Sequence, residues 1–185
     1  FFTDQSTQRM TSQMLNSAFG MASIVADMNA DGVNDIVKDT ALNAPQYVAV
    51  SYNDPDNEGV FDLFDDFHNF APYHVNTGDL NQDGRLDVVV SDDASDRFRF
   101  NTGTDIFGRV TWSSAKTFQF VSGGDDGFAS NNYIEDLDND GWPDVLIADV
   151  DVDISGCNRR THIYRNKGGN PGQLIDLIEE AQSTG

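Results

Sequence analysis

The sequence repeats one acidic nine-residue pattern three times, Asp-x-(Asn/Asp)-x-Asp-Gly-x-x-Asp, and aliphatic residues follow each copy at once. The copies span 27–35, 79–87 and 136–144. Alternate residues of a tight loop can direct their oxygens at one point, and a hard dication requires six to eight such oxygens. Glycine at the sixth position lets the chain turn sharply, because a positive φ costs glycine little. The pattern therefore predicts three calcium-binding loops.

Each loop is predicted to supply side-chain oxygens from its first, third, fifth and ninth positions and a carbonyl oxygen from its seventh. The predicted ligands are, loop by loop, Asp27, Asn29, Asp31, Val33 and Asp35; Asp79, Asn81, Asp83, Arg85 and Asp87; Asp136, Asp138, Asp140, Trp142 and Asp144. Oxygen ligands favour Ca²⁺ over zinc or copper, which prefer imidazole and thiolate. Magnesium is less suitable, because it tolerates a crowded cage of protein ligands poorly.

An EF-hand has a similar loop, but it requires a bidentate Glu at position 12 and a helix after it. Position 12 is here Lys38, Val90 and Ile147. The apolar runs after the loops instead predict strands that are buried on both faces. Plain turns also use Asp, Asn and Gly. Three copies with one spacing favour a metal site, since unneutralised carboxylates ~4 Å apart repel by about 4 kcal/mol at an effective dielectric of about 20.

Other features recur with the loops, whose first aspartates are spaced by 52 and 57 residues. A Phe with a small neighbour precedes each loop, and two strand-like segments follow it, the first of them ending at Asn. The Phe and its small neighbour lie at 19–20, 70–71 and 128–129. The strand-like segment that ends at Asn lies at 47–53, 97–101 and 162–166, and the closing segment lies near 60–64, 118–121 and 174–178. About four strands in a period of about 50 residues are typical of a β-propeller blade.

The sequence thus predicts an all-β fold, a single module of propeller blades with about four antiparallel strands each. Three repeats are expected, at about 5–64, 65–121 and 122–178. Residues 1–4 look like the closing segment of a preceding unit, and a helix is an alternative to a strand at 174–181. Because closed propellers have about four to eight blades, we expect part of a longer propeller or an arc that another chain completes.

Phe19-Gly20, the acidic loops with their apolar strands, and Ile163-Tyr-Arg-Asn-Lys-Gly-Gly resemble FG-GAP/VCBS repeats, the blades of integrin α-subunits and of many secreted bacterial proteins. The resemblance covers nearly the whole chain. It implies a propeller fold, calcium between the first two strands of each blade, and extracellular adhesion or recognition. Only the first copy has Phe-Gly, and none has the Gly-Ala-Pro that ends the integrin motif. The chain is therefore closer to VCBS repeats than to integrins.

Composition restricts the partners and the location. With 31 acidic and 11 basic residues, the net charge is −20, which disfavours nucleic acid and anionic membrane surfaces. No apolar stretch approaches the ~18 residues that a spanning helix needs, so no membrane insertion is expected. Cys157 is the only cysteine and cannot form an intramolecular disulfide. Secretion, to the exterior or surface of a bacterial cell, is inferred from loops suited to millimolar Ca²⁺.

Three functions are compatible with these features. The first is a calcium-stabilised module for adhesion, assembly or recognition of a glycan or protein. The second is a building block that polymerises with like chains through its open ends. The third is a propeller-type polysaccharide lyase or hydrolase. We expect no enzyme, because the sequence has no nucleophile elbow, His-Glu-x-x-His motif or phosphate-binding Gly loop.

The remaining candidates for chemistry are few. His68, His74 and His162 lack metal-ligand spacing and are expected to be surface or strand residues. The segment 149–160 contains Arg159 and Arg160, which could bind a carboxylate or a sulfated sugar, although a solvated hairpin or a salt bridge is the alternative. Four aromatic residues could stack on sugars but are expected in the core: Tyr47, Tyr52, Trp112 and Trp142.

Overall fold

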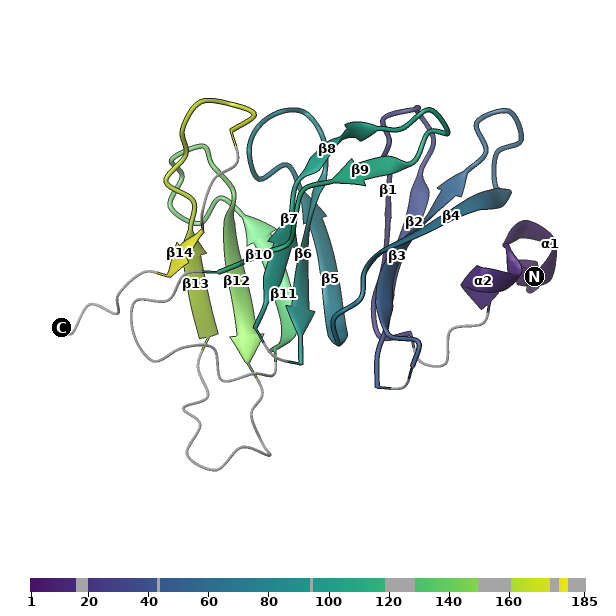
Figure 1. The fold of residues 1–185 in the computed structure, drawn as a ribbon, viewed down its shortest axis with the longest axis horizontal. Helices are drawn as coiled ribbons and strands as arrows, with labels where there is room; N and C mark the ends of the chain where they lie inside the picture. Colours follow the sequence, from purple (N-terminus) through teal and green to yellow (C-terminus); the bar gives the residue numbers. More distant parts are fainter. Residues whose placement is uncertain are drawn as a thin grey trace.

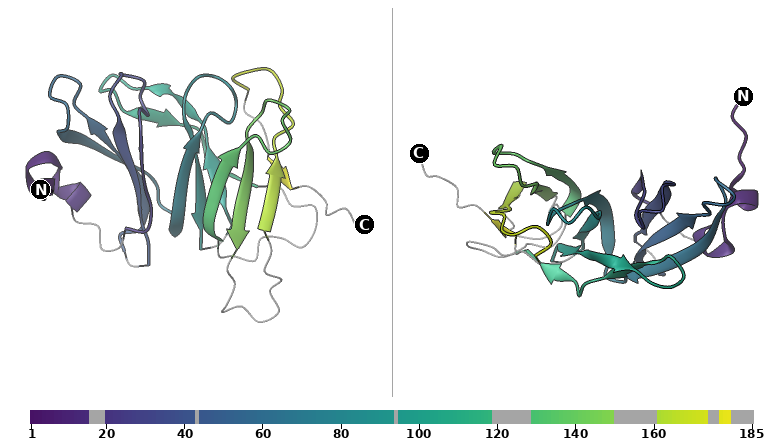
Figure 2. Two further views of the ribbon diagram at one scale, coloured as in Figure 1. Left: turned by 180° about the vertical axis from the view of Figure 1, so that it is seen from behind. Right: turned by 90° about the horizontal axis from the view of Figure 1, so that it is seen from above.

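The computed structural model describes residues 1–15, 20–42, 44–93, 95–118, 129–149, 161–173 and 177–179. Within them the chain is almost entirely β-structure. Three four-stranded antiparallel sheets follow one another along the molecule, and the N-terminus lies at one end, beside the first sheet (Figure 1, Figure 2). We call these sheets blades 1, 2 and 3. None of the described sheets closes on itself.

The strands of each blade lie in chain order across its sheet. Blade 1 consists of β1 (Ser23–Ala26), β2 (Asp35–Thr40), β3 (Tyr47–Asn53) and β4 (Phe61–His68). Blade 2 consists of β5 (Pro72–Gly78), β6 (Asp87–Asp92), β7 (Arg97–Arg99) and β10 (Lys116–Thr117). Blade 3 consists of β11 (Ala129–Glu135), β12 (Asp144–Asp149), β13 (Thr161–Arg165) and β14 (Ile178–Glu179). A hairpin of β8 (Asn101–Thr104) and β9 (Val110–Trp112) separates β7 from β10, and helices α1 (Ser6–Arg9) and α2 (Ser12–Leu15) precede blade 1.

The predicted all-β fold of four-stranded antiparallel blades is confirmed. Each acidic loop leads directly into a second strand, namely β2, β6 or β12, and β6 is buried at every residue. The predicted third strand of blade 1 coincides with β3, and that of blade 3 with β13 to within one residue. The pattern of apolar residues in the sequence therefore locates the strands that contribute most of the core.

Some predicted segments differ. Residues 1–4 form no strand, and the side chains of Phe1 and Phe2 are fully exposed ahead of α1. The predicted strand at 97–101 is divided, because β7 ends at Arg99 and β8 begins at Asn101 to pair with β9. The closing strand of blade 2 is β10, just before the predicted 118–121. At the C-terminal end, Ile178–Glu179 pairs with β13 as a strand, while 174–176 and 180–181 lie outside the described residues.

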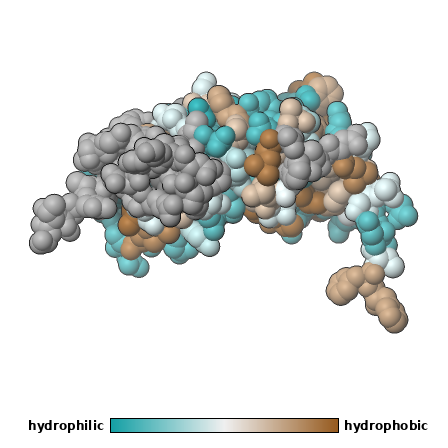
Figure 3. Space-filling view, turned by 90° about the horizontal axis from the view of Figure 1, so that it is seen from below, coloured by the Kyte–Doolittle hydropathy of each residue, from teal (hydrophilic) through white to brown (hydrophobic). Residues whose placement is uncertain are grey.

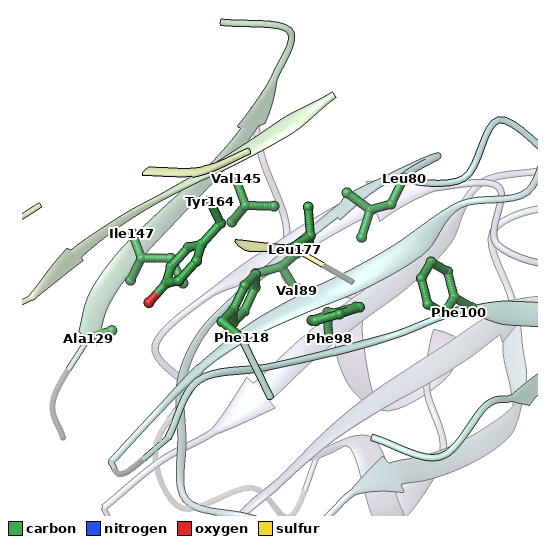
Figure 4. Close-up of a cluster of buried hydrophobic side chains, with 10 residues drawn as sticks. All are labelled: Leu80, Val89, Phe98, Phe100, Phe118, Ala129, Val145, Ile147, Tyr164 and Leu177. Atoms are coloured by element: carbon green, nitrogen blue, oxygen red, sulfur yellow. The ribbon is translucent and has the colours of Figure 1, made fainter. Parts of the chain in front are cut away.

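Two hydrophobic clusters fill the spaces between successive blades. The first lies between blades 1 and 2 and includes Val37, Val50, Val88 and Val90. The second lies between blades 2 and 3, where aromatic rings of blade 2 meet aliphatic residues of blade 3 (Figure 4). Its ten members are Leu80, Val89, Phe98, Phe100, Phe118, Ala129, Val145, Ile147, Tyr164 and Leu177. The core of the molecule is thus a series of blade-to-blade contacts.

Both contacts use the same positions of the aliphatic run that follows each acidic loop. The second residue of one run, Val37 or Val89, joins the cluster toward the next blade. The flanking residues of the next run face back, as Val88 and Val90 do toward blade 1. We call the side of a blade toward its predecessor the leading face and the opposite side the trailing face. Alternation of side chains along a strand accounts for this division.

Several predicted features lie outside the described residues: Phe19, Phe128, Cys157 and the segment 150–160 with its two arginines. Among the helices of the described part, none is long and apolar enough to cross a membrane. Seen from below, hydrophobic surface lies in separate patches among hydrophilic surface (Figure 3).

Candidate metal centre

The three acidic loops connect β1 to β2, β5 to β6 and β11 to β12, along the upper edge of the molecule (Figure 1). All fifteen predicted ligands lie in the part of the chain that the structure describes. The sixth-position glycines have the expected positive φ, at 97° for Gly32, 83° for Gly84 and 93° for Gly141. The fourth positions are also left-handed, with φ of 59° at Ala30, 56° at Gln82 and 62° at Asn139. The sequence pattern did not indicate the left-handed backbone at the fourth position, because this position is occupied by a different residue in each loop.

The same five hydrogen bonds hold each loop. The N–H of position 5 donates to the side chains of positions 1 and 3, and the N–H of position 6 donates to position 1. The N–H of position 7 donates to position 5, and that of position 2 to position 9. These bonds measure 2.8–3.2 Å in the three loops. The conformation that gathers the oxygens is therefore built into each loop by its own backbone.

The third loop contains the most compact set of carboxylates. One oxygen each from Asp136, Asp138 and Asp144 lies within 4.8 Å of the others, a grouping that could hold a metal ion. In the first two loops the third position is an amide, Asn29 or Asn81, which offers a neutral oxygen. Hard dications accept both carboxylate and amide oxygens. The oxygen donors of the third loop therefore suit a hard dication such as Ca²⁺, and this loop has the most carboxylates of the three.

Arginines neutralise part of this charge. Arg85 forms an ion pair with Asp83 of its own loop, and its Nε donates to the carbonyl of Asn101 at 2.9 Å. In the third loop Arg165, from β13, pairs with Asp138 and lies 3.3 Å from Asp140. The sequence analysis did not include Arg165, which reaches the loop only because β13 lies beside β12. A dication at these loops would compete with the guanidinium groups for the same oxygens.

The ninth-position aspartates hold each loop in place by hydrogen bonds. Asp35, Asp87 and Asp144 are buried, and one oxygen of each accepts the N–H of position 2. The other oxygen accepts the N–H of an Asn that ends the third strand or follows it within two residues: Asn53 at 2.9 Å, Asn101 at 2.8 Å and Asn166 at 2.9 Å. The loop is thereby tied to the third strand of its own blade.

Burial dominates the ionisation of these aspartates. It raises the pKa of Asp35 to about 6 and the pKa of Asp87 to about 7, against the opposing effect of the two backbone hydrogen bonds. Burial also raises the pKa of Asp144. Since the charged form of a buried carboxyl is poorly solvated, a bound cation would favour it.

The same asparagines connect one blade to the loop before it. Asn101 Nδ2 donates to the carbonyl of Met28 at 2.9 Å, and Asn166 Nδ2 donates to the carbonyl of Leu80 at 2.8 Å. Met28 and Leu80 occupy the second positions of the preceding loops. The sequence marked these asparagines as strand ends, but their partners lie more than 70 residues away in the chain.

The three histidines were expected to be surface or strand residues. All three lie in strands, and two of them are buried. His68 is fully buried, with Nε2 3.0 Å from Asp92 Oδ1, and His162 is buried beside Tyr164. His74 is partly buried, which lowers its pKa. The expected core placement holds for Tyr47 and Tyr52, both buried.

Trp112 is partly buried and stacks on Phe67 with a centroid distance of 4.2 Å. Trp142 is partly buried and lies against Gly168, where a Cβ would approach its indole nitrogen to 2.3 Å. Both indoles therefore pack against other parts of the fold.

A small cavity of about 250 Å³ lies where the first strands of the three blades meet. Its polar lining consists of Ser23, His74, Asn76, Asn131, Asn132 and Tyr133, so the described residues that line it include no Asp, Glu, Lys or Arg. Asn132 is fully buried, and its Nδ2 donates to Ser91 Oγ at 2.9 Å. In a chain of net charge −20 this neutral lining suits an uncharged, hydrogen-bonding ligand.

Three successive four-stranded sheets, each with an acidic loop between its first two strands, define a protein built of β-propeller-type blades. Residues 79–147 match the FG-GAP-like repeat family. The chain therefore contains an FG-GAP-like repeat, and the resemblance seen in the sequence is confirmed over these residues. The match extends from the first aspartate of the second loop to the end of the third aliphatic run. No curated protein matches the chain.

Proposed function

We propose that this chain is a calcium-binding β-propeller module of a secreted or cell-surface protein that mediates adhesion, assembly or recognition. The observation that carries the proposal is the same loop conformation at three sites, in which the same five hydrogen bonds fix four oxygen-bearing side chains. A turn needs no such set of carboxylates, and their mutual repulsion opposes it. A bound Ca²⁺ removes that repulsion.

Calcium has a structural role in this proposal. The ligands would be the side chains of positions 1, 3, 5 and 9 and the seventh-position carbonyls of Val33, Arg85 and Trp142. A bound ion supplies positive charge that holds the loop oxygens together. Because Asn101 and Asn166 bond to the preceding loops, a stiffened loop also stabilises the contact between blades. FG-GAP-like repeats are typical of extracellular proteins, where Ca²⁺ is millimolar, and this supports the proposed location.

Thermal unfolding with and without a chelator tests the structural role. We expect Ca²⁺ to raise the melting temperature and EDTA to lower it, with Mg²⁺ less effective than Ca²⁺ at equal concentration. Ligand binding to the folded state alone stabilises it by about 2.7 kcal/mol at a hundredfold excess over Kd. An unchanged melting temperature in EDTA would overturn the proposal.

The cavity between the first strands is the proposed site for recognition of a neutral glycan. A few amide and imidazole groups can orient a small ligand by hydrogen bonds, and an aromatic ring beside them can pack against its apolar face. Binding to a glycan array, with His74→Ala and Asn131→Ala as variants that weaken it, tests this placement. Binding that neither substitution weakens would place recognition elsewhere. That the chain is not an enzyme stays a prediction, to be tested by polysaccharide degradation assays.

A further inference from the structure

The trailing face of blade 3 exposes positions that blades 1 and 2 bury against the next blade. The second residue of the acidic loop shows the difference most clearly. Met28 is 1% exposed and Leu80 0%, because the following blade covers both, whereas Leu137 is 45% exposed. No blade follows blade 3 in the described part of the chain.

A row of residues paired across the strands of the trailing face shows the same difference in exposure between blade 3 and the other two blades. Its members, paired across the first three strands, are Ile24–Val37–Val50 in blade 1, Asn76–Val89–Phe98 in blade 2 and Tyr133–Leu146–Ile163 in blade 3. The second and third members are fully buried in blades 1 and 2. In blade 3, Tyr133 is 57% and Ile163 44% exposed. With Leu137 and Leu146, they form an apolar surface of the kind that marks an interaction site.

Blade 1 presents the complementary leading face. Asn101 and Asn166 each donate to the preceding loop, but no blade precedes the equivalent Asn53 in the described part of the chain. Its Nδ2 donates to the Asn34 carbonyl at 3.0 Å, as Asn166 Nδ2 also does to the Pro143 carbonyl at 3.1 Å. Val25 stands where blade 3 has Ile134, which packs into the cluster between blades 2 and 3, yet Val25 is 66% exposed. Helix α2 covers part of this face beyond Ile36, where Lys38 Nζ donates to the Met14 carbonyl at 2.7 Å and the Tyr47 hydroxyl donates to the Gln13 carbonyl at 3.5 Å.

We propose that the trailing face of blade 3 docks on the leading face of blade 1 in a second copy of this chain. A suitable partner must set aliphatic side chains beside Leu146 and an amide donor opposite the Leu137 carbonyl. Blade 1 offers both. Ile36 lies at the position whose aliphatic side chain packs against the preceding blade in blades 2 and 3, and Asn53 lies at the position of the amide donor. Head-to-tail contacts form a ring where the rotation closes. Two copies, each using both faces, close a ring of six blades, within the usual range of about four to eight.

Light scattering coupled to size exclusion, in calcium-containing buffer, measures the assembly directly. We expect a dimer of twice the 20.4 kDa chain mass. Ile163→Glu and Val25→Glu should each raise the dimer dissociation constant at least about tenfold, because each buries a carboxylate in an apolar contact. The matched control is Ile106→Glu, at a site 92% exposed in the β8–β9 hairpin, which should leave the dimer intact. Circular dichroism confirms that each variant is folded.

Mixing the two monomeric variants tests the head-to-tail arrangement. The Val25→Glu chain keeps an intact trailing face and the Ile163→Glu chain an intact leading face, so an equimolar mixture should restore dimers with one native contact. A monomeric wild type, an assembly larger than two chains, or a mixture that stays monomeric would overturn the proposal. The metal content is measured separately, so that failure of calcium binding and failure of the contact are distinguishable.

Discussion

Asn166 Nδ2 donates a hydrogen bond of 2.8 Å to the carbonyl oxygen of Leu80, and the two residues belong to different blades. The backbone N–H of Asn166 is at the same time bonded to Asp144, the ninth residue of the loop in its own blade. One asparagine therefore joins two acidic loops. Asn101 repeats the arrangement between Asp87 and Met28. Loop geometry and blade contact thus form one hydrogen-bonded system.

Replacing Asn101 with Asp tests this connection. The substitution keeps the shape and the oxygen that accepts the Gly103 N–H, but it removes the donor to the Met28 carbonyl. Since a buried acceptor is left unpaired beside a carboxylate, the free energy of unfolding should fall by about 1–3 kcal/mol. Chemical denaturation measures the change. Asn57→Asp, the same substitution at an exposed site, should change stability by less than about 0.5 kcal/mol, and equal effects of the two would contradict the role of Asn101.

Gly84→Ala tests the backbone requirement of the loop. Nothing lies within 4 Å of an added Cβ, so the cost arises only from the φ of +83°. A left-handed conformation costs a residue with a Cβ about 1–2 kcal/mol, and we expect this loss of stability together with weaker calcium binding. Gly20→Ala is the control, because Gly20 has no positive φ and its nearest neighbour, the Asp39 carbonyl, is 3.8 Å from the added atom. Calorimetric titration that found both variants equal to wild type would contradict the expectation.

Tyr52→Phe tests the anchor of the β8–β9 hairpin. The Tyr52 hydroxyl of blade 1 accepts the N–H of Val110 at 2.8 Å, and the ring is buried. Its loss leaves a buried N–H unpaired and should lower the free energy of unfolding by about 1–3 kcal/mol, with faster hydrogen exchange at Val110. Tyr133→Phe removes an exposed hydroxyl and should have little effect. Unchanged exchange at Val110 in Tyr52→Phe would show that the hairpin is held by other contacts.

Without calcium, stability should fall as the pH rises. Burial raises the pKa of Asp35 to about 6 and that of Asp87 to about 7, above the 3.8 of an unperturbed Asp. The folded state then binds protons more tightly than the unfolded state, so this contribution is complete below pH ~3.8 and is lost as the pH rises through about 6 to 7. Melting in EDTA between about pH 5 and pH 8 measures the slope. Because metal ligands must be deprotonated, stabilisation by Ca²⁺ should grow over the same window. Stability that increases with pH in EDTA would contradict the account.

The sequence predicts the blades well because each rests on local signals. The loop pattern and the β-branched run after it locate β2, β6 and β12, and the alternation before Asn53 locates β3. The hairpin of β8 and β9 is less visible, since Asn101–Thr104 has no apolar alternation and few residues of high β propensity. The contacts of Asn101, Asn166 and Arg165 could not be predicted, because they depend on which strand or loop lies beside each residue. For Phe1 and Phe2 the prediction was wrong in the opposite sense: this apolar pair looks like part of a strand, but it forms none and is exposed.

Native mass spectrometry of the calcium-loaded chain tests the central claim most directly, because it counts the bound ions. We predict three Ca²⁺ per chain, two in Asp31→Ala, Asp83→Ala or Asp140→Ala, and none in the triple variant. Asp56→Ala, at an exposed site outside the loops, should keep all three. Fewer than two ions on the wild-type chain, or a count that the loop substitutions leave unchanged, would contradict calcium binding by the acidic loops.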